Sequence, residues 1–346
     1  MNGLERMRKI INGETPDRVP VFPLVHFGTA HLGGVSIRDF STDAATNARC
    51  LIQAAKTCAY DGLHPGVDVT VEGEAAGSKV EYPEDNIPFV VEPVLGQPNL
   101  DKLAMPDVTK SARLPMMIES TRLCAQEVGE ELYICSVIMG PMNCASQIRG
   151  VENLMFDFMD RPEFAAELLE FCTDLEIMFG RALIEAGAHS LIIGEALCSP
   201  AFVSPKLYRE FIVPRQQRLI RALFDHGAES TWLHTCADIS PIAEDYAVNS
   251  GTNAVDIDWQ VDMKWLLNLD SVKSHGTAAR GNLNPAGALL NGPPEAVVEE
   301  SRQLIEACKD TKKFVLCSGC DINPRSLPEN VSAMVEASER YGVYEG

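Results

Sequence analysis

The chain has 346 residues, 46% of them hydrophobic, and a formal net charge of −20 at pH 7. A chain of this length can bury a large core. The acidic sequence contains no cluster of basic residues of the kind that neutralises phosphate groups. We therefore expect no nucleic acid and no anionic membrane among its partners. No segment approaches the roughly 18 uninterrupted apolar residues that a membrane span needs.

The eleven cysteines are scattered through helical and strand-like stretches and do not stand at the spacings of a disulfide framework. The N-terminal segment alternates charged and apolar residues and lacks the apolar core of a signal peptide. Reduced thiols are typical of the cytoplasm, so we predict a cytoplasmic protein with free cysteines.

Strand and helix signals alternate along the first half of the chain with no convincing linker. An N-terminal helix is followed by a predicted short strand over 19–23, a helix over 43–58 and an extended stretch over 61–71. A nearly continuous apolar run predicts a buried strand over 132–139. Pro162 then opens a long helix, in which apolar residues recur at three- and four-residue steps.

The second half of the chain repeats this alternation. A strand is predicted over 190–194, and Ser204 and Pro205 form the N-cap and first turn of a helix that Pro214 is expected to kink. The clearest later helix is predicted over 293–309. Further strands are predicted over 230–236, 253–258, 276–281 and 314–318.

About eight strands that alternate with helices are typical of a closed parallel barrel. The alternative, a doubly wound open sheet, requires a phosphate-binding glycine loop after an early strand. The sequence contains no G-x-G-x-x-G motif and no P-loop. We predict one α/β domain, a (β/α)8 TIM barrel over residues 1–346 with an N-terminal helical extension.

His234 and Cys236 stand two residues apart in a predicted strand, so we expect both side chains on one face of it. Cys320 follows another predicted strand and a glycine turn. One imidazole and two thiolates form a three-ligand zinc set whose open fourth position is typical of catalytic zinc. Cysteines near a histidine are commonly core residues, but here both halves lie at carboxyl ends of predicted strands, which meet at one mouth of a barrel.

Cys317 is an alternative to Cys320 as the third metal ligand. It precedes Cys320 by three residues, so it can replace Cys320 or join it in a closed four-ligand site. A closed site would be structural, and the interpretation as a catalytic metal would then weaken.

Carboxylates at the ends of predicted strands are further candidates for the same site. Asp68 and Asp258 stand within strand-like runs, where a carboxylate needs a metal, a cation or N–H groups as its partner. Glu195 fits a solvated loop or a helix terminus at least equally well. Asp256 is expected on the same strand face as Asp258, and only packing can separate their roles.

Six segments that run nearly from end to end carry a resemblance to a known family. They are Asp17–Pro20, Asp68–Gly77, Glu195–Pro205, His234–Cys236, Gly281–Pro285 and Ser318–Ile322. The chain resembles the uroporphyrinogen decarboxylase superfamily, and within it the zinc-containing, corrinoid-dependent methyltransferases of the methylcobalamin:coenzyme M methyltransferase type. This resemblance implies that His234, Cys236 and Cys320 are zinc ligands, and it favours Cys320 over Cys317.

The resemblance also implies a reaction and its partners. We expect Zn2+ to activate a thiol such as coenzyme M, and methylcobalamin or another corrinoid to serve as co-substrate. The corrinoid is expected free or on a separate corrinoid protein, because the Asp-x-His-x-x-Gly signature is absent here. Asp258 is a candidate fourth ligand before the substrate arrives, and Met139, Met142 and Phe202 are candidates for the apolar surface that admits the corrinoid.

Other functions within the superfamily remain alternatives. One is transfer from a methylated amine, methyl ether or methyl halide to a corrinoid protein, and another is zinc binding without turnover. The decarboxylase shares a counterpart of Asp68, but it needs arginines after its first strand, and segment 21–31 has none. Its active-site tyrosine is replaced by Gln147 or a neighbour, and its last-strand Gly-His-Gly turn by Ser318–Cys320.

Overall fold

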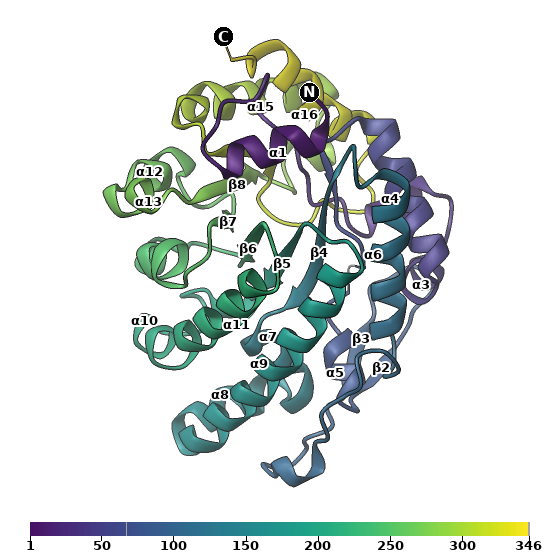
Figure 1. Ribbon diagram of the computed structural model, residues 1–346, viewed down its shortest axis with the longest axis vertical. Coiled ribbons are helices and arrows are strands. Elements are labelled where there is room, and N and C mark those ends of the chain that lie inside the picture. Colours follow the sequence, from purple (N-terminus) through teal and green to yellow (C-terminus); the bar gives the residue numbers. More distant parts are fainter. Residues whose placement is uncertain (67, 345–346) are drawn as a thin grey trace.

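The computed structural model describes residues 1–66 and 68–344. Seven parallel strands form one curled sheet in the order β1-β4-β5-β6-β7-β8-β9, and helices lie around its outer side (Figure 1). All residues of the longest strand, β4, are buried, as expected for a parallel sheet covered on both faces. The strands are β1 (Gly62–Leu63), β4 (Tyr133–Met139), β5 (Ser190–Gly194), β6 (Ser230–His234), β7 (Ala254–Asp256), β8 (Ala278–Leu283) and β9 (Phe314–Ser318).

Helices connect successive strands of the sheet, and a separate hairpin of β2 (Lys79–Glu81) and β3 (Phe89–Glu92) follows β1. No helix in the described ranges is long and apolar enough to cross a membrane. The helices are α1 (Gly3–Ile11), α2 (Gly28–Leu32), α3 (Ile37–Thr42), α4 (Ala44–Cys58), α5 (Val71–Ala75), α6 (Leu114–Val128), α7 (Pro141–Arg149), α8 (Val151–Asp160), α9 (Pro162–Glu185), α10 (Pro205–Leu207), α11 (Val213–Asp225), α12 (Met263–Asn268), α13 (Asp270–His275), α14 (Ala288–Asn291), α15 (Pro294–Cys308) and α16 (Pro328–Tyr341).

Most elements begin and end close to their predicted positions. Strands β5 and β9 have the predicted bounds, and α9 begins at Pro162 as expected. Asp43 is the N-cap of α4, where its carboxylate accepts a hydrogen bond from the Thr46 backbone N–H over 2.8 Å. The kink expected near Pro214 appears as a π-helical turn, η3 (Tyr208–Ile212), immediately before α11, because proline supplies no N–H to a regular ladder.

The strand predicted over 19–23 is absent as a regular strand. Val21 forms one parallel bridge with Leu316 of β9, and the Phe22 N–H donates to the Leu316 carbonyl over 2.9 Å. On its other side, the Val21 carbonyl accepts from the Asp61 N–H over 2.8 Å, beside β1. Prolines within the segment remove donors that a continuous ladder would need. Isolated hydrogen bonds therefore join the segment to both edge strands of the sheet.

The extended stretch predicted over 61–71 is mostly loop. Strand β1 covers two residues of it, α5 begins at Val71, and Val67 lies outside the described residues. Two other predicted strands are also too long, since β6 ends at His234 and β7 at Asp256. Cys236 and Asp258, which follow these two strands, are therefore loop residues.

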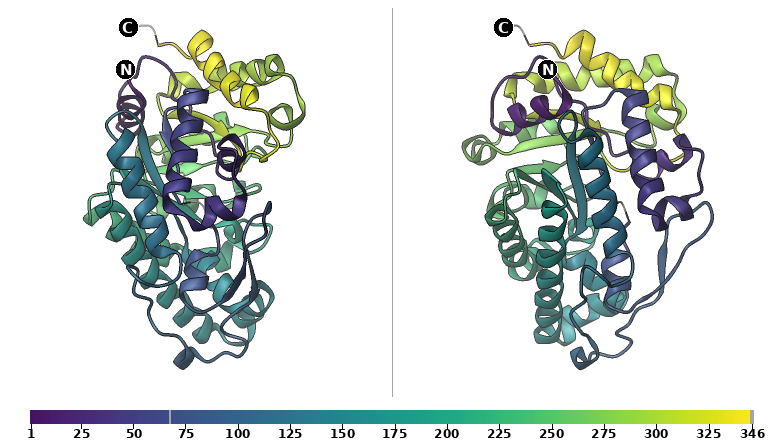
Figure 2. Two further views of the ribbon diagram at one scale, coloured as in Figure 1. Left: turned by 90° about the vertical axis from the view of Figure 1, so that its right-hand side faces the viewer. Right: turned by 45° about the vertical axis from the view of Figure 1, so that its right-hand side comes forward.

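Both termini lie at one end of the molecule, together with α1, α15 and α16 (Figures 1 and 2). Asp61, just before β1, is 2% exposed and forms ion pairs with Arg6 and Arg18, each over 3.0 Å. These residues precede their strands, so they lie at the amino ends of the sheet, whereas the candidate site residues follow their strands. Segment Asp17–Pro20, one of the six that carried the resemblance, thus belongs to the end opposite the site.

Candidate metal centre and substrate cavity

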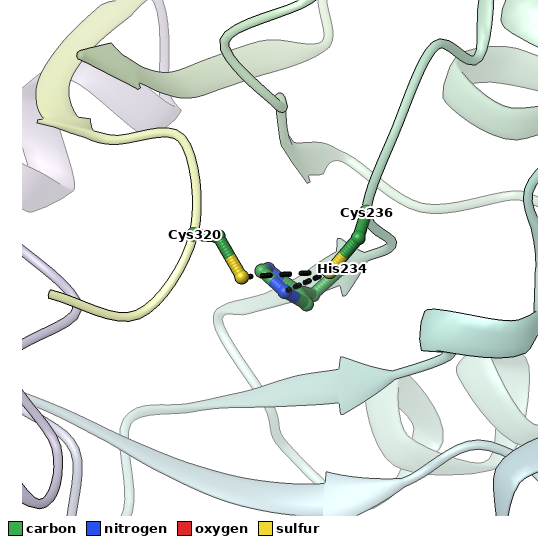
Figure 3. Close-up of side chains that lie close together, drawn as sticks. All are labelled: His234, Cys236 and Cys320. Carbon is green, nitrogen blue, oxygen red and sulfur yellow. Dashed lines mark hydrogen bonds between the residues drawn. The ribbon is translucent and has the colours of Figure 1, made fainter. Parts of the chain in front are cut away.

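Three side chains from two distant parts of the chain converge at the carboxyl ends of β6 and β9 (Figure 3). The Sγ atoms of Cys236 and Cys320 are 3.4 Å apart, and Cys236 Sγ is 3.9 Å from His234 Nε2. Within residues 1–66 and 68–344, this is the one group of three or more His, Cys, Asp or Glu side chains whose ligand atoms all lie within 4.8 Å of one another.

These separations fit a zinc ion. Zn–S bonds of about 2.3 Å and Zn–N bonds of about 2.1 Å at tetrahedral angles place ligand atoms about 3.5 to 3.8 Å apart. Thiolate and imidazole donors favour zinc over magnesium or calcium, which prefer oxygen. Three protein ligands leave one tetrahedral position for a further ligand.

Loop geometry, and not strand alternation, brings the Cys236 thiol to His234. The prediction of one shared strand face is wrong, because β6 ends at His234. The chain turns immediately after Cys236 at Ala237, whose φ of +71° is left-handed. In the loop after β9, a Cβ at Gly319 would collide with the backbone nitrogen of Trp259. The glycine therefore allows this loop to approach the loop after β7 closely, which positions Cys320.

Three neighbouring strands align His234, Asp256 and Arg280 in one row across the sheet. The Asp256 carboxylate lies 3.1 Å from His234 Nδ1 and accepts two hydrogen bonds from Arg280, over 2.7 and 2.8 Å. Burial acts to raise the pKa of Asp256, but Arg280 and His234 lower it to about 2, so the carboxylate is ionised. Burial acts to lower the pKa of His234, but Asp256 and Cys320 raise it to about 10, so without a metal the ring is protonated. A metal would take the place of the Nε2 proton while Nδ1–H continues to donate to Asp256, which is the tautomer a metal requires.

The Arg280 side chain is fully buried, and each of its three nitrogens has a partner. Its Nη1 lies 3.0 Å from His64 Nε2, and its Cζ lies 4.7 and 4.8 Å from the ring centroids of Phe22 and Trp232. Burial and the nearby Arg280 charge lower the pKa of His64 well below its usual value, so His64 is neutral and accepts from the arginine. His64 and Arg280 were missed by the sequence analysis, because only the register of the strands makes them neighbours.

A cavity of about 160 Å3 opens beside the three candidate ligands. Its polar side chains beyond those ligands are His26, Asp68, Asn143 and Asp321. His26 Nδ1 lies against the Asp321 carboxylate on the wall, and neither residue was predicted, although Asp321 follows Cys320 directly. Most of the remaining wall is apolar: Leu24, Phe27, Val69, Val137, Met139 and Ile192.

Asp68 lies on the cavity wall, as predicted, but in a loop and not within a strand. Its Oδ1 accepts from the Thr70 N–H over 2.9 Å and from the Thr70 hydroxyl over 2.7 Å. Its Oδ2 pairs with Arg113, which also binds Glu74 over 2.7 Å. The partners that stabilise the Asp68 carboxylate, Thr70 and Arg113, are therefore not among the residues that line the cavity.

Glu195 is buried and does not line the cavity. Its Oε2 accepts from the Asn143 N–H over 3.1 Å in the first turn of α7, and Asn143 Oδ1 in return accepts from the Leu197 N–H over 3.2 Å. Burial raises the pKa of Glu195 to about 7. This arrangement agrees with the alternative that Glu195 lies at a helix terminus, here that of α7. Its contact positions Asn143, which lines the cavity.

Asp258 and Cys317 are not in the group of three ligands. Asp258 follows β7 in a loop, where its Oδ1 accepts from the Gln260 N–H over 3.0 Å. Cys317 is 1% exposed within β9, and burial raises its pKa to about 12. All eleven cysteines are described and free, in agreement with the expected reduced thiols.

The three apolar candidates for the corrinoid surface have different environments. Met139 lines the cavity, Met142 is fully buried core, and Phe202 is 56% exposed in the loop after β5. Trp259, 48% exposed in the loop after β7, was not predicted. Exposed aromatic side chains therefore stand on two loops at the same end of the sheet as the cavity.

Replacing the buried Glu72 with glutamine should remove a pH dependence of stability. Burial raises the pKa of Glu72 to about 7 from an ordinary value of 4.5, although the Met139 N–H donates to it over 2.9 Å. Between these pH values the folded state keeps a proton that the unfolded chain loses, so wild-type stability falls as the pH rises. From pH 5 to pH 8, the free energy of unfolding of Glu72→Gln should rise by about 2 to 3 kcal/mol relative to wild type.

Urea unfolding at the two pH values measures this difference. Glu127→Gln, on the exposed surface of α6, is the matched control and should follow the wild-type profile. Parallel pH profiles for wild type and Glu72→Gln would contradict the assignment of a protonated, buried carboxyl group.

The chain is similar to known proteins over nearly its whole length. The family described as Uroporphyrinogen decarboxylase (URO-D) matches residues 2–341. The chain is 26% identical over 343 residues to "Methylcobamide:CoM methyltransferase MtaA" of Methanosarcina barkeri, with 97% of each chain covered. It is 24% identical over 360 residues to "Uroporphyrinogen decarboxylase" of Xylella fastidiosa, covering 97% of this chain and 98% of that one.

A solved structure shows the same fold. The "methyltransferase from Methanosarcina mazei" superposes with a TM-score of 0.88 and 23% sequence identity, over 99% of each chain. The uroporphyrinogen decarboxylase family matches nearly the whole length of the chain, and this match establishes the family of the protein. The chain belongs to the uroporphyrinogen decarboxylase family, and its similar relatives include methylcobamide:CoM methyltransferases.

Proposed function

We propose that this protein is a zinc-dependent methyltransferase that moves a methyl group between a corrinoid and a thiol. One observation carries the proposal: an imidazole and two thiols converge with zinc-compatible separations beside a cavity. The relatives named methylcobamide:CoM methyltransferases support the choice of corrinoid and thiol as reaction partners. Coenzyme M is the thiol that those names give.

His234, Cys236 and Cys320 would hold the metal, and Asp256 would hold the His234 ring in the required tautomer. A bound zinc ion would lower the pKa of an incoming thiol, so that a thiolate persists at neutral pH. Two cysteinates and a neutral histidine offset the charge of about +2 on the ion, so the substrate sulfur stays electron-rich. The largely apolar cavity wall would limit the access of water to the reacting sulfur.

The methyl transfer is a nucleophilic displacement by the thiolate sulfur. A sulfur–carbon bond forms as the cobalt–carbon bond of the methyl corrinoid breaks. Both electrons of the broken bond remain on cobalt, which passes from Co(III) to Co(I), and the thiol proton leaves to solvent. The products are a methyl thioether and the reduced corrinoid.

The corrinoid would approach from the loops at the carboxyl ends of the strands. Phe202 and Trp259 are exposed there, and Met139 lines the cavity together with the candidate metal ligands. For the fold, we propose a closed (β/α)8 barrel over residues 1–346, with segment 19–23 in the eighth strand position and α1 as its N-terminal extension. The isolated hydrogen bonds on both sides of Val21 support closure.

The reverse transfer, from a methylated amine, ether or halide to a corrinoid protein, is the second candidate. The cavity favours it in one respect, because the described residues that line it include no lysine or arginine for a charged thiol such as coenzyme M. The same feature disfavours decarboxylation of a porphyrinogen with its many carboxylates.

Anaerobic incubation of the zinc-loaded protein with methylcobalamin and a panel of thiols tests the proposal. We expect loss of the methylcobalamin absorbance and appearance of the methyl thioether, at a rate at least about 100-fold above that of the same mixture without protein. The His234→Ala protein should show the rate of the protein-free mixture. No acceleration by a wild-type protein that carries one zinc per chain would contradict the proposed function.

A further inference from the structure

The cavity beside the candidate metal ligands has an unusual charge pattern for a site that would receive a charged thiol. Among the described residues that line it, none is lysine or arginine. Beyond the three candidate ligands, its titratable side chains are His26 and the carboxylates of Asp68 and Asp321. An anionic group in this cavity would face two carboxylates, and the one imidazole among these side chains, His26, already lies against Asp321.

The two buried arginines that pair with Asp68 and Asp256 already direct each of their three side-chain nitrogens at a partner within the protein. Arg113 Nη1 pairs with Asp68, its Nε donates to Glu74 over 2.7 Å, and its Nη2 donates to the Thr70 hydroxyl over 2.9 Å. Arg280 directs two nitrogens to Asp256 and the third to His64. Recruiting either arginine to a ligand would leave a buried carboxylate unpaired, which is strongly destabilising.

The two carboxylates also have partners within the protein, and Asp68 is the more fully engaged. Asp68 already accepts two hydrogen bonds from Thr70 and pairs with Arg113. Asp321 pairs with His26. A positively charged tail would lose its hydration in the largely apolar cavity, and at Asp321 it would compete with His26 for the carboxylate.

The size and lining of the cavity fit an apolar group. Its volume of about 160 Å3 is close to that of an engineered apolar cavity of about 150 Å3 that binds benzene. Six apolar side chains supply most of the wall, among them Phe27, Met139 and Ile192. Burial of an apolar tail against them is favourable, whereas an anionic tail loses its hydration without compensation.

We infer that the cavity selects a small thiol, or its methyl thioether, whose tail is uncharged and apolar, and that it discriminates against thiols with an anionic tail. The inference rests on the proposed function, since it takes a sulfur atom beside the three candidate ligands as the reacting atom. It departs from the substrate in the names of the relatives, because coenzyme M carries a sulfonate.

Thiols of similar length and different charge test the inference. The zinc-loaded protein is assayed with propane-1-thiol, 2-mercaptoethanesulfonate and cysteamine, with methylcobalamin as donor, and each rate is divided by that of the protein-free reaction. Calorimetry gives the Kd of each thiol in the absence of methylcobalamin. We expect propane-1-thiol to exceed each charged thiol at least tenfold, both in kcat/KM and in affinity.

Introducing a cation at the cavity rim provides a charge-swap test. Val69 lines the cavity and is 42% exposed, so a lysine can be accommodated there without burying its charge. Val69→Lys should shift the preference toward 2-mercaptoethanesulfonate at least fivefold, relative to propane-1-thiol. Val91→Lys, which adds the same charge on exposed β3 outside the cavity, should leave the ratio unchanged.

Tighter binding of 2-mercaptoethanesulfonate or cysteamine than of propane-1-thiol would overturn the inference. An equal shift of the ratio by Val69→Lys and Val91→Lys would overturn it as well. Absence of methyl transfer with every thiol would instead refute the proposed function, and the calorimetric ranking alone would then decide the inference.

Discussion

Cys320→Ala protein is expected to bind zinc at least about 100-fold more weakly than wild type and to lose methyl transfer to thiols. Even partners of metal ligands typically change metal affinity by about 10- to 100-fold, and loss of a thiolate ligand should cost more. Cys320 Sγ is one of only two thiols in the candidate group, 3.4 Å from Cys236 Sγ. Zinc content after anaerobic dialysis against a competing chelator measures the effect.

Cys317→Ala is the matched control. Cys317 is three residues away and lies buried within β9, outside the group of ligand atoms. This variant should keep one zinc per chain and should transfer methyl groups. Loss of zinc in both variants would indicate a closed four-ligand site, and retention of zinc in Cys320→Ala would contradict the ligand assignment.

Arg280→Met is expected to lower the free energy of unfolding by about 3 to 5 kcal/mol. The substitution leaves the Asp256 carboxylate buried without the two hydrogen bonds that it accepts from Arg280. Asp256 is 3% exposed, so water cannot replace the lost guanidinium. Urea unfolding of the zinc-free protein measures the loss.

The double variant Asp256→Asn with Arg280→Met separates this electrostatic cost from altered packing. Removing both charges should restore part of the stability, because no unpaired charge remains buried. Zinc affinity of the double variant should still be about 10- to 100-fold below wild type, since an amide is a weaker acceptor for His234 Nδ1–H. A double variant as unstable as Arg280→Met would contradict the ion-pair account.

Hydrophobic pattern and residue chemistry were sufficient to predict much of this molecule. The continuous apolar runs of β5 and β9 and the proline that opens α9 are local signals, and these elements appear as predicted. The convergence of His234, Cys236 and Cys320 was predictable too, because parallel strands end at one edge and few residue types bind zinc.

Features that depend on loops and register were not predictable. Cys236 and Asp258 lie beyond the ends of β6 and β7, where backbone turns set the direction of each side chain. Arg280 and His64 are far apart in sequence, and only the pairing of strands makes the arginine the neighbour of Asp256. No periodicity of the sequence encodes such register, because each strand pattern is compatible with several pairings.

Zinc K-edge X-ray absorption of the anaerobically purified protein tests the central claim most directly. We predict one zinc per chain with two sulfur ligands and one imidazole nitrogen, completed by a light atom, and a change to three sulfur ligands on addition of propane-1-thiol. Absence of zinc, or a closed shell of protein ligands that no thiol alters, would contradict the proposed catalytic metal.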